Sequence, residues 1–536
     1  MESSIPISNL IMTIQDLYLI INYKEMKKLD LIDTFYDNRD TVGYILFIAS
    51  ILFLLYLFVN PANDLVIHID EHYTLGLIQL PFENAWKLLV SDVHPPLYYL
   101  ILMAGCGVLN VLHIPYDVVF VTKMLSLLPL ILILIVAVTK IRRDYNILTM
   151  GIFTFAITTM SSCMIEFLTV RMYGWAMLFL LMAFIYYAEI LKDSNRKSWI
   201  LFTVFTVLCA YTHYYLLFSL AVLYVLYPIY LYFNKDMDLK ENLKKWALSI
   251  VAAFILYLPW FFTFINQTLV TKNTYTTMKS VTIGTQINYF TFFILKQTSK
   301  LTDVIIFKIL IAIFFILLVY LLFIHLLDFK KDESFFIFSG FAVYILSILI
   351  GVLILTYTFR PLDIRYILPA IVVFWFAIAV LLGKVNTKLL LIIMVLAIVM
   401  FGTVGILMTN DTFNAHNKEG SQEKNALSQI NNANSVVIYN SSFHYDCYHY
   451  TLNNTKEYTL KKLNLPYEEK TCTYENNLTK ILEDNPDKDV YVWRLINNEK
   501  DKKVPDGIVA EKVVNRGKIW LVKLDLDNNE EEQVTE

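Results

Sequence analysis

The sequence predicts an all-α polytopic membrane protein, with about 11 or 12 transmembrane helices, that carries a small α/β domain at its carboxyl end. Of its 536 residues, 57% are hydrophobic, 15% are aromatic and 17% are charged, and the mean hydropathy is +0.54. A water-soluble globule of this length could not bury so large an apolar share. Long apolar runs fill the chain as far as Asn410, and a polar composition begins at Asp411.

Charge is distributed unevenly along the chain. The formal net charge is −3, yet we count about 22 acidic and about 16 basic residues from Asp411 onward, which leaves a net charge of about +3 for the preceding part. This difference indicates two regions in different solvents, a membrane domain over 41–410 and a soluble domain over 411–536. Neither region offers the basic surface that nucleic-acid binding requires, so that class of function is excluded.

Residues 1–40 mix apolar and Lys-rich stretches and have no short apolar core of the kind found in cleavable signal peptides. They predict a cytoplasmic or interfacial lead-in. Apolar runs long enough to cross a hydrocarbon core of about 30 Å follow. The stretch 199–233 is too long for one span and has basic flanks, so we expect it to cross twice as a hairpin. The predicted spans are 41–59, 119–139, 147–165, 174–191, two within 199–233, 246–264, 303–325, 334–356, 367–383 and 388–408.

The apolar run from Pro95 to Leu112 decides the topology. If it does not cross the membrane, the loops on one side carry about 18 Lys and Arg, against about 8 on the other side. Because basic loops favour the cytoplasm, we favour 11 spans, with this run at the outer interface; the alternative is 12 spans. The amino terminus then faces the cytoplasm, and the carboxyl-terminal domain is exoplasmic. The first outer loop covers 60–118.

The soluble domain over 411–536 combines strand-like and helix-like pieces, which predicts a small α/β fold. Examples of the strand-like pieces are NSVVIYNSS and KDVYVWRLIN. Cys447 and Cys472 could pair in an exoplasmic compartment, and two separate thiols are an equal alternative.

The first outer loop contains the densest group of ionisable and rigid residues in the chain. Asp70 and Glu71 follow the first span closely, and Asp92 and His94 stand just before the double proline Pro95-Pro96. Short amphipathic pieces broken at prolines would lie flat at the interface and hold carboxylates within reach of a lipid phosphate and a water-borne acceptor. The alternative is that these groups are merely solvated.

Three further ionisable features fall on the same predicted face of the membrane. They are Glu166 with Arg171 and Tyr173, His213 within Tyr-Thr-His-Tyr-Tyr, and Arg360, Asp363, Arg365 and Tyr366 at the end of a late span. A charge beside an apolar segment is costly without a partner, and an anionic ligand would supply one. The alternatives are a structural tie between Glu166 and Arg171, a hydrogen-bonded structural histidine and snorkelling arginines.

Taken in order, these motifs resemble a known superfamily. The set comprises the acidic pair, His-Pro-Pro-Leu-Tyr-Tyr, Arg-Met-Tyr, Thr-His-Tyr-Tyr and Arg365-Tyr366-Ile367-Leu368-Pro369. It is similar to the GT-C integral-membrane glycosyltransferases, in the branch of the dolichyl-phosphate-mannose protein mannosyltransferases and their bacterial and archaeal relatives, including the aminoarabinose lipid A transferase. The resemblance covers about residues 41–410, whereas the soluble domain resembles no family.

The resemblance implies that the chain transfers one sugar, a hexose such as mannose, from a polyprenyl-phosphate donor to a glycan, lipid or protein acceptor at the outer membrane face. The site residues that it implies are Asp70 as general base, Glu71 and Asp92 as supporting carboxylates, Arg171 and Arg365 as phosphate clamps, and His94, Tyr173, His213 and Tyr366 as further substrate contacts. No cofactor is certain; Mg²⁺ or Mn²⁺ held by Asp70, Glu71 and Asp92 is the candidate.

The chain departs from the pattern in two respects. It has no β-trefoil insertion, which disfavours a protein acceptor of the mannosyltransferase type, and no Trp-Trp-Asp motif, which disfavours transfer of a whole oligosaccharide. Two alternatives from other classes stay open. A lipid-linked sugar translocase would also be helical and aromatic, and a non-catalytic envelope assembly protein could keep the same carboxylates.

Overall fold

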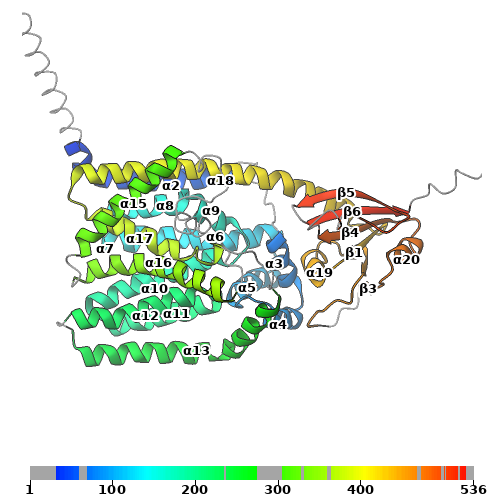
Figure 1. The fold of residues 1–536 in the computed structure, drawn as a ribbon, viewed down its shortest axis with the longest axis horizontal. Coiled ribbons are helices and arrows are strands. Elements are labelled where there is room, and N and C mark those ends of the chain that lie inside the picture. Colours follow the sequence, from blue (N-terminus) through cyan, green and yellow to red (C-terminus); the bar gives the residue numbers. More distant parts are fainter. Residues whose placement is uncertain are drawn as a thin grey trace, which may run out of the picture.

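The structure is a computed structural model of the 536-residue chain. It describes residues 32–59, 69–234, 237–274, 305–326, 331–358, 364–467, 472–495, 500, 503–516 and 519–526. Arg360, Asp363 and most of the predicted lead-in over 1–40 lie outside these ranges. A bundle of helices makes up the larger part of the molecule, and a mixed α/β domain adjoins one end of it (Figure 1).

Each predicted span overlaps a helix of the bundle, although the bounds differ for two of them. Eight of the described helices are long and apolar enough to cross a membrane, so the chain is a multi-pass membrane protein. The helices that match the predicted spans are α2 (Arg39–Val59), α6 (Val118–Val136), α8 (Ile147–Thr159), α10 (Tyr173–Asp193), α11 (Arg196–Thr212), α12 (Leu216–Phe233), α13 (Leu239–Thr274), α15 (Ile305–Leu326), α16 (Asp332–Thr358), α17 (Ala370–Gly383) and α18 (Lys388–Ile430).

Shorter helices connect these spans. The π-helical turn η1 (Ala137–Ile141) and α7 (Arg142–Asp144) extend α6, and the 3-10 turn η3 (Ile364–Tyr366) precedes α17. The remaining short helices are α3 (Ile69–Gln79), α4 (Phe82–Ser91), α5 (Leu97–Val111) and α9 (Ser161–Leu168). Helix α5 covers the apolar run that decided the topology. Its 15 residues reach only about 22 Å, less than the thickness of a hydrocarbon core.

Two predicted spans differ from the helices observed. The span over 147–165 is broken at Met160, whose extended backbone (φ −70°, ψ 119°) separates α8 from α9. The span over 388–408 continues through Asp411 as one helix of 43 residues that ends at Ile430. The change in composition at Asp411 therefore falls within one helix and does not mark where a new fold begins.

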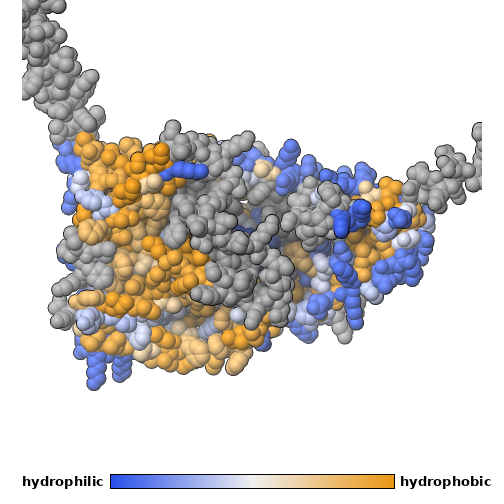
Figure 2. All heavy atoms as spheres, in the orientation of Figure 1, coloured by the Kyte–Doolittle hydropathy of each residue, from blue (hydrophilic) through white to orange (hydrophobic). Residues whose placement is uncertain are grey.

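The core of the bundle lies around α8, α10 and α17. Every residue of α17 is buried, as expected of a helix enclosed by others. Helices α2 and α8 approach closely, since a Cβ added at Gly151 would lie 2.1 Å from the carbonyl oxygen of Gly43; small residues commonly allow such contacts in membranes. Apolar side chains dominate the visible surface of the bundle, whereas hydrophilic ones are common on the α/β domain (Figure 2).

The C-terminal domain contains a six-stranded mixed sheet with the strand order β3-β2-β1-β4-β6-β5. Strands β1 to β4 are parallel, and β6 pairs antiparallel with both β4 and β5. The prediction of an α/β domain is thus confirmed. Its elements are β1 (Ser435–Tyr439), α19 (Ser442–Tyr448), β2 (Lys456–Thr459), β3 (Thr473–Tyr474), α20 (Leu478–Glu483), β4 (Asp489–Leu495), β5 (Ile508–Arg516) and β6 (Ile519–Leu526).

The two ends of the bundle should lie on opposite sides of the membrane. Helix α7 lies at one end and the C-terminal domain at the other (Figure 1). We expect a membrane-impermeant maleimide to label Lys424→Cys in intact cells and Arg143→Cys only after permeabilisation, because both positions are exposed and basic loops favour the cytoplasm. Labelling of Arg143→Cys in intact cells would contradict the predicted orientation.

Candidate functional site

The predicted site residues gather at the end of the bundle that adjoins the C-terminal domain, where α3 packs against α5 and α19 (Figure 1). They come from separate stretches of chain, each at a helix end or in a short connection. Helix α3 carries Asp70 and Glu71, the α4–α5 connection carries Asp92 and His94, the α9–α10 connection leads through Arg171 to Tyr173, the α11–α12 bend carries His213, and η3 carries Arg365 and Tyr366.

Prolines set the path of the first loop. Pro81 stands at the start of α4 and Pro96 at the start of α5. Proline suits a helix start because its ring fixes φ and its missing N–H would have no helical partner there. Asp92 ends α4 in an extended conformation, and its N–H donates to the carbonyl of Leu88. The chain therefore turns between the two helices at the position of Asp92 and His94.

Asp70 forms an ion pair with an arginine from a distant part of the chain. Its Oδ2 atom lies 3.0 Å from NH1 of Arg365, and both side chains are about one-third exposed. A second guanidinium, that of Arg171, donates to the backbone carbonyl of Asp70 at 3.4 Å and to Oγ1 of Thr74 at 3.3 Å. The carboxylate is thus paired with one cation, lies within reach of the charge of a second, and is open enough to meet a substrate.

Arg171 is also tied to the first loop by a chain of hydrogen bonds. Its Nη2 atom lies 3.0 Å from Nε2 of His94, and Nδ1 of His94 lies 3.0 Å from Oδ2 of Asp92. Because a guanidinium can only donate, Nε2 accepts and Nδ1 carries the proton that is donated to Asp92. Burial alone would raise the pKa of Asp92, but the contacts with His94 and the charge of Arg171 lower it below its ordinary value.

Glu71 has structural partners. Its Oε1 lies 2.5 Å from Nζ of Lys123 and accepts the N–H of Val170 at 2.6 Å, and Lys123 also donates to the carbonyl of Leu168 at 3.2 Å. The side chains of Glu71 and Lys123 are only 3% and 8% exposed. The pair fastens α3 to α6 and to the connection that carries Arg171, a geometry that favours a positioning role for Glu71.

Sequence reasoning missed Lys123, although a signal was present. This lysine lies inside a predicted apolar span, where a charge is costly unless it has a partner. A search for that partner among the acidic residues of the first loop would have included Glu71. The alternative of a structural tie between Glu166 and Arg171 is not observed; Arg171 contacts Asp70, Thr74 and His94.

His213 belongs to an aromatic cluster beside these charges. Its ring centroid lies 5.5 Å from that of Tyr173, 5.9 Å from that of Tyr366 and 6.0 Å from that of Tyr215. Burial, reinforced by the nearby charge of Arg171, lowers the pKa of His213 to about 3. The imidazole is therefore neutral at physiological pH and offers a neutral hydrogen-bonding edge beside the cationic groups.

Three buried polar atoms in this region have no hydrogen bond of normal geometry to the described residues. They are Nε of Arg171, Nδ1 of His213 and the hydroxyl of Tyr99 in α5. The positive charge of Arg171 acts on both Tyr99 and His213. Buried polar groups are nearly always hydrogen-bonded, so each exception requires an explanation. A polar ligand that binds between α5, the α9–α10 connection and the α11–α12 bend would supply the missing partners.

The arrangement of the carboxylates does not fit a divalent cation. Asp70 is paired with Arg365, Glu71 with Lys123 and Asp92 with His94. Among the residues that the structure describes, no group of three or more His, Cys, Asp or Glu side chains is placed to hold a metal ion. A hard cation needs several converging oxygen ligands, and we derive no step through one.

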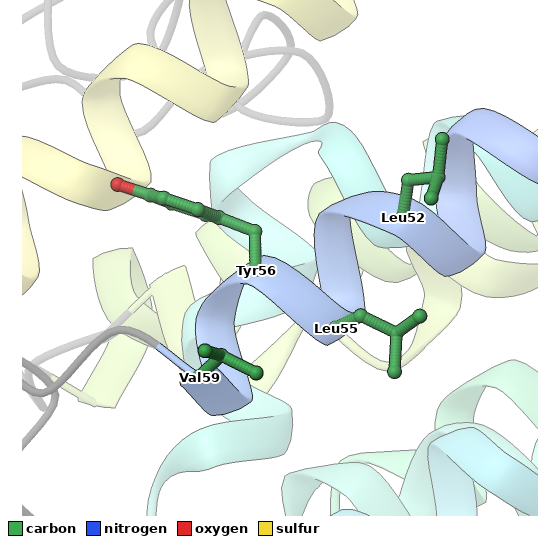
Figure 3. Close-up of a pocket in the computed structure, with 4 residues that line it drawn as sticks. All are labelled: Leu52, Leu55, Tyr56 and Val59. Atoms are coloured by element: carbon green, nitrogen blue, oxygen red, sulfur yellow. The ribbon is translucent and has the colours of Figure 1, made fainter.

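A shallow apolar groove of about 460 Å³ lies on α2, and none of the ionisable site residues lines it. Figure 3 shows its lining side chains, Leu52, Leu55, Tyr56 and Val59. The Tyr56 hydroxyl donates to Oδ1 of Asn410 in α18 at 3.1 Å. The groove is thus part of the apolar outer surface of the bundle and carries no group suited to acid, base or anion chemistry.

We expect Lys123→Met to destabilise the protein strongly, because the buried carboxylate of Glu71 would lose its cation. Removing one partner of a buried pair typically costs about 3–5 kcal/mol, which thermal unfolding in detergent would record as a lower Tm. The double variant with Glu71→Gln should recover much of the loss. Lys87→Met, which breaks an exposed pair with Glu83, is the control and should change little. An unchanged Tm for Lys123→Met would contradict the expectation.

Comparison with known proteins gives a structural likeness without a sequence match. No family model and no curated protein sequence matches the chain. Solved structures that resemble it include two of ArnT from Cupriavidus metallidurans, one in the apo state and one bound to undecaprenyl phosphate. In both cases the TM-score is 0.56, the sequence identity is 12%, and the alignment covers 90% of this chain and 98% of ArnT. The chain therefore has the fold of ArnT.

Proposed function

We propose that the chain is a membrane glycosyltransferase that moves a single sugar from a polyprenyl-phosphate donor to an acceptor at the outer membrane face. The acceptor is a glycan, a lipid or a protein, and the sugar is a hexose such as mannose. Asp70 acts as the general base, and Arg171 and Arg365 bind the phosphate of the donor. Residues 41–410 form the catalytic membrane domain, and residues 411–536 form an exoplasmic domain.

One observation carries the proposal: an acidic residue whose side chain is about one-third exposed contacts two guanidinium groups. Asp70 contacts Arg365 through its side chain and Arg171 through its backbone. Nearby, Nε of Arg171 and Nδ1 of His213 are buried without hydrogen-bond partners among the described residues. Phosphate oxygens match such donors because guanidinium forks bind them in pairs. The likeness to ArnT, whose structure has been solved with bound undecaprenyl phosphate, adds support.

The chemistry requires a base at one end of the reacting centre and positive charge at the other. The acceptor oxygen forms a bond to the anomeric carbon while the bond from that carbon to the phosphate oxygen breaks. The hydroxyl proton passes to the carboxylate of Asp70, and the bonding electron pair leaves with the phosphate. Fixed cations stabilise the charge that develops on the leaving group. Arg171 and Arg365 supply that charge here.

The pairing of Asp70 with Arg365 suggests how the base is activated. Before the sugar donor binds, the guanidinium of Arg365 contacts the carboxylate at 3.0 Å. A bound phosphate would compete for this guanidinium, and a carboxylate that loses an opposite charge becomes a stronger base. Asp70 would then be most basic when a donor is present. Arg171 stays in place because His94 and Thr74 also hold it.

Asp70→Asn should abolish most of the turnover and leave binding of undecaprenyl phosphate within about twofold, since a positioned base contributes about 10²–10⁴ in rate. Arg365→Gln should weaken that binding by about 10-fold to 100-fold, because a hydrogen bond to a charged group is worth about 1.5–3 kcal/mol. Binding is measured with protein in nanodiscs, and turnover by mass spectrometry of polyprenyl-phosphate sugars in cells. Glu83→Gln, an exposed acid on α4, is the matched control.

Cells that carry Asp70→Asn should accumulate the same lipid-phosphate sugar as cells that lack the protein. If Asp70→Asn matches the wild type while Arg365→Gln weakens phosphate binding, Asp70 is not the base. If neither variant changes binding or turnover, the proposal is wrong. Donor lipid that moves across a reconstituted bilayer without loss of its sugar would instead favour the translocase.

A further inference from the structure

Helix α3 is held from three sides by three consecutive residues. Side chains on an α-helix are separated by about 100° per residue, so neighbours in sequence point in different directions. Asp70 points to Arg365 in η3, and Glu71 points to Lys123 in α6. His72 points to the C-terminal domain. The rotation of α3, and with it the placement of Asp70, therefore depends on contacts from three parts of the chain.

The contact of His72 is buried and polar. Its side chain is 5% exposed; Nδ1 lies 2.8 Å from the hydroxyl of Tyr450, and Nε2 lies 3.6 Å from Oε2 of Glu423. The ring also packs on Tyr448, with centroids 4.8 Å apart, and the Tyr448 hydroxyl donates to Oε1 of Glu423 at 2.8 Å. Glu423 belongs to α18 and Tyr448 to α19, so one side chain of α3 meets both elements.

Gly76 extends this contact along the same face of α3, because it follows His72 by four residues. A Cβ added at Gly76 would lie 1.8 Å from the backbone carbonyl oxygen of Asp446 in α19. The two helices therefore touch backbone to backbone, and any side chain at this position would force them apart. Between the two residues, Tyr73 stacks on Phe443 of α19 with ring centroids 5.9 Å apart and an interplanar angle of 18°.

We infer that the C-terminal domain is a positioning element for catalysis: through His72 and Gly76 it fixes the orientation of α3 and so the placement of Asp70. The inference rests on the proposed function, in which Asp70 is the base. A displacement of about 1 Å at a reacting group can cost about 100-fold in rate. The phosphate-binding residues Arg171 and Arg365 lie on other elements than α3, so weakening the contact with the domain should reduce turnover much more than donor binding.

The test compares two Gly→Ala variants in neighbouring helices. Both replacements favour helix formation by up to about 1 kcal/mol, but only Gly76→Ala inserts a methyl group between α3 and α19. A Cβ at Gly107 in α5 would meet nothing within 4 Å. For Gly76→Ala we expect kcat to fall by about tenfold or more, the affinity for undecaprenyl phosphate to stay within twofold, and amide hydrogen exchange in α3 to become faster. Gly107→Ala should match the wild type in all three.

A second pair of variants probes the polar contact. His72→Phe keeps a ring against Tyr448 and removes the contacts with Tyr450 and Glu423, and should reproduce the loss of kcat and the faster exchange in α3. Glu457→Gln is its control, because Glu457 is buried in the C-terminal domain and bonds to Tyr439 and His449, away from α3. It should leave exchange in α3 unchanged. His72→Phe also decides the question if Gly76→Ala does not fold.

Each outcome supports or overturns the inference. If Gly76→Ala and His72→Phe turn over and exchange like their controls, the domain does not position α3, and the proposed function is unaffected. If both variants lose donor binding as fully as turnover, the domain holds the whole site and not Asp70 in particular, and the inference is wrong. If the wild type itself neither binds undecaprenyl phosphate nor turns over, the proposed function fails, and hydrogen exchange in α3 alone decides whether the domain holds this helix.

Discussion

Two charges withdrawn from water, on Glu71 and Lys123, join the first loop to the bundle. Burying them costs free energy that only a well-formed pair with further hydrogen bonds can offset. The N–H of Val170 and the carbonyl of Leu168 supply those bonds. Because this pair fixes α3 and the α9–α10 connection together, Asp70 and Arg171 have defined positions relative to each other. The contacts of Arg365 with Asp70 and of His94 with Arg171 depend on these relative positions.

The fold explains why so many ionisable groups can share a small volume. Several apolar helices end at the same side of the bundle. Side chains from distant stretches of chain meet there without crossing the bundle core. Asp70 and Arg365 are 295 residues apart in sequence, and the pair nevertheless forms one side of the site. The neutral imidazole of His213 lies among tyrosines beside these charges. Anionic chemistry at such a place would be screened from bulk water more than at an open surface.

Hydropathy predicted the spans because the bilayer thickness fixes the length of an apolar helix. The density of ionisable residues in the first outer loop led to Asp70, and the rule that a charge beside an apolar run needs a partner led to Arg171 and Arg365. The partners themselves could not be predicted, since the pairing of Glu71 with Lys123 depends on how α3 lies on α6. The continuity of α18 past Asp411 was also missed, because a change of solvent alters composition without ending a helix.

The contact between His72 and Tyr450 joins residues 378 positions apart, and this separation has a consequence for biosynthesis. At a synthesis rate of about 5–20 residues per second, the first loop waits about 20–75 s before Tyr450 is made. Membrane insertion of the spans precedes the folding of the C-terminal domain, so the face of α3 with His72 and Gly76 lacks its partners throughout that interval. A chain that stalls before α19 therefore keeps the ties of α3 to Arg365 and Lys123 but lacks the contacts of His72 and Gly76 with the domain. Completion of the site is therefore among the last events in the maturation of the protein.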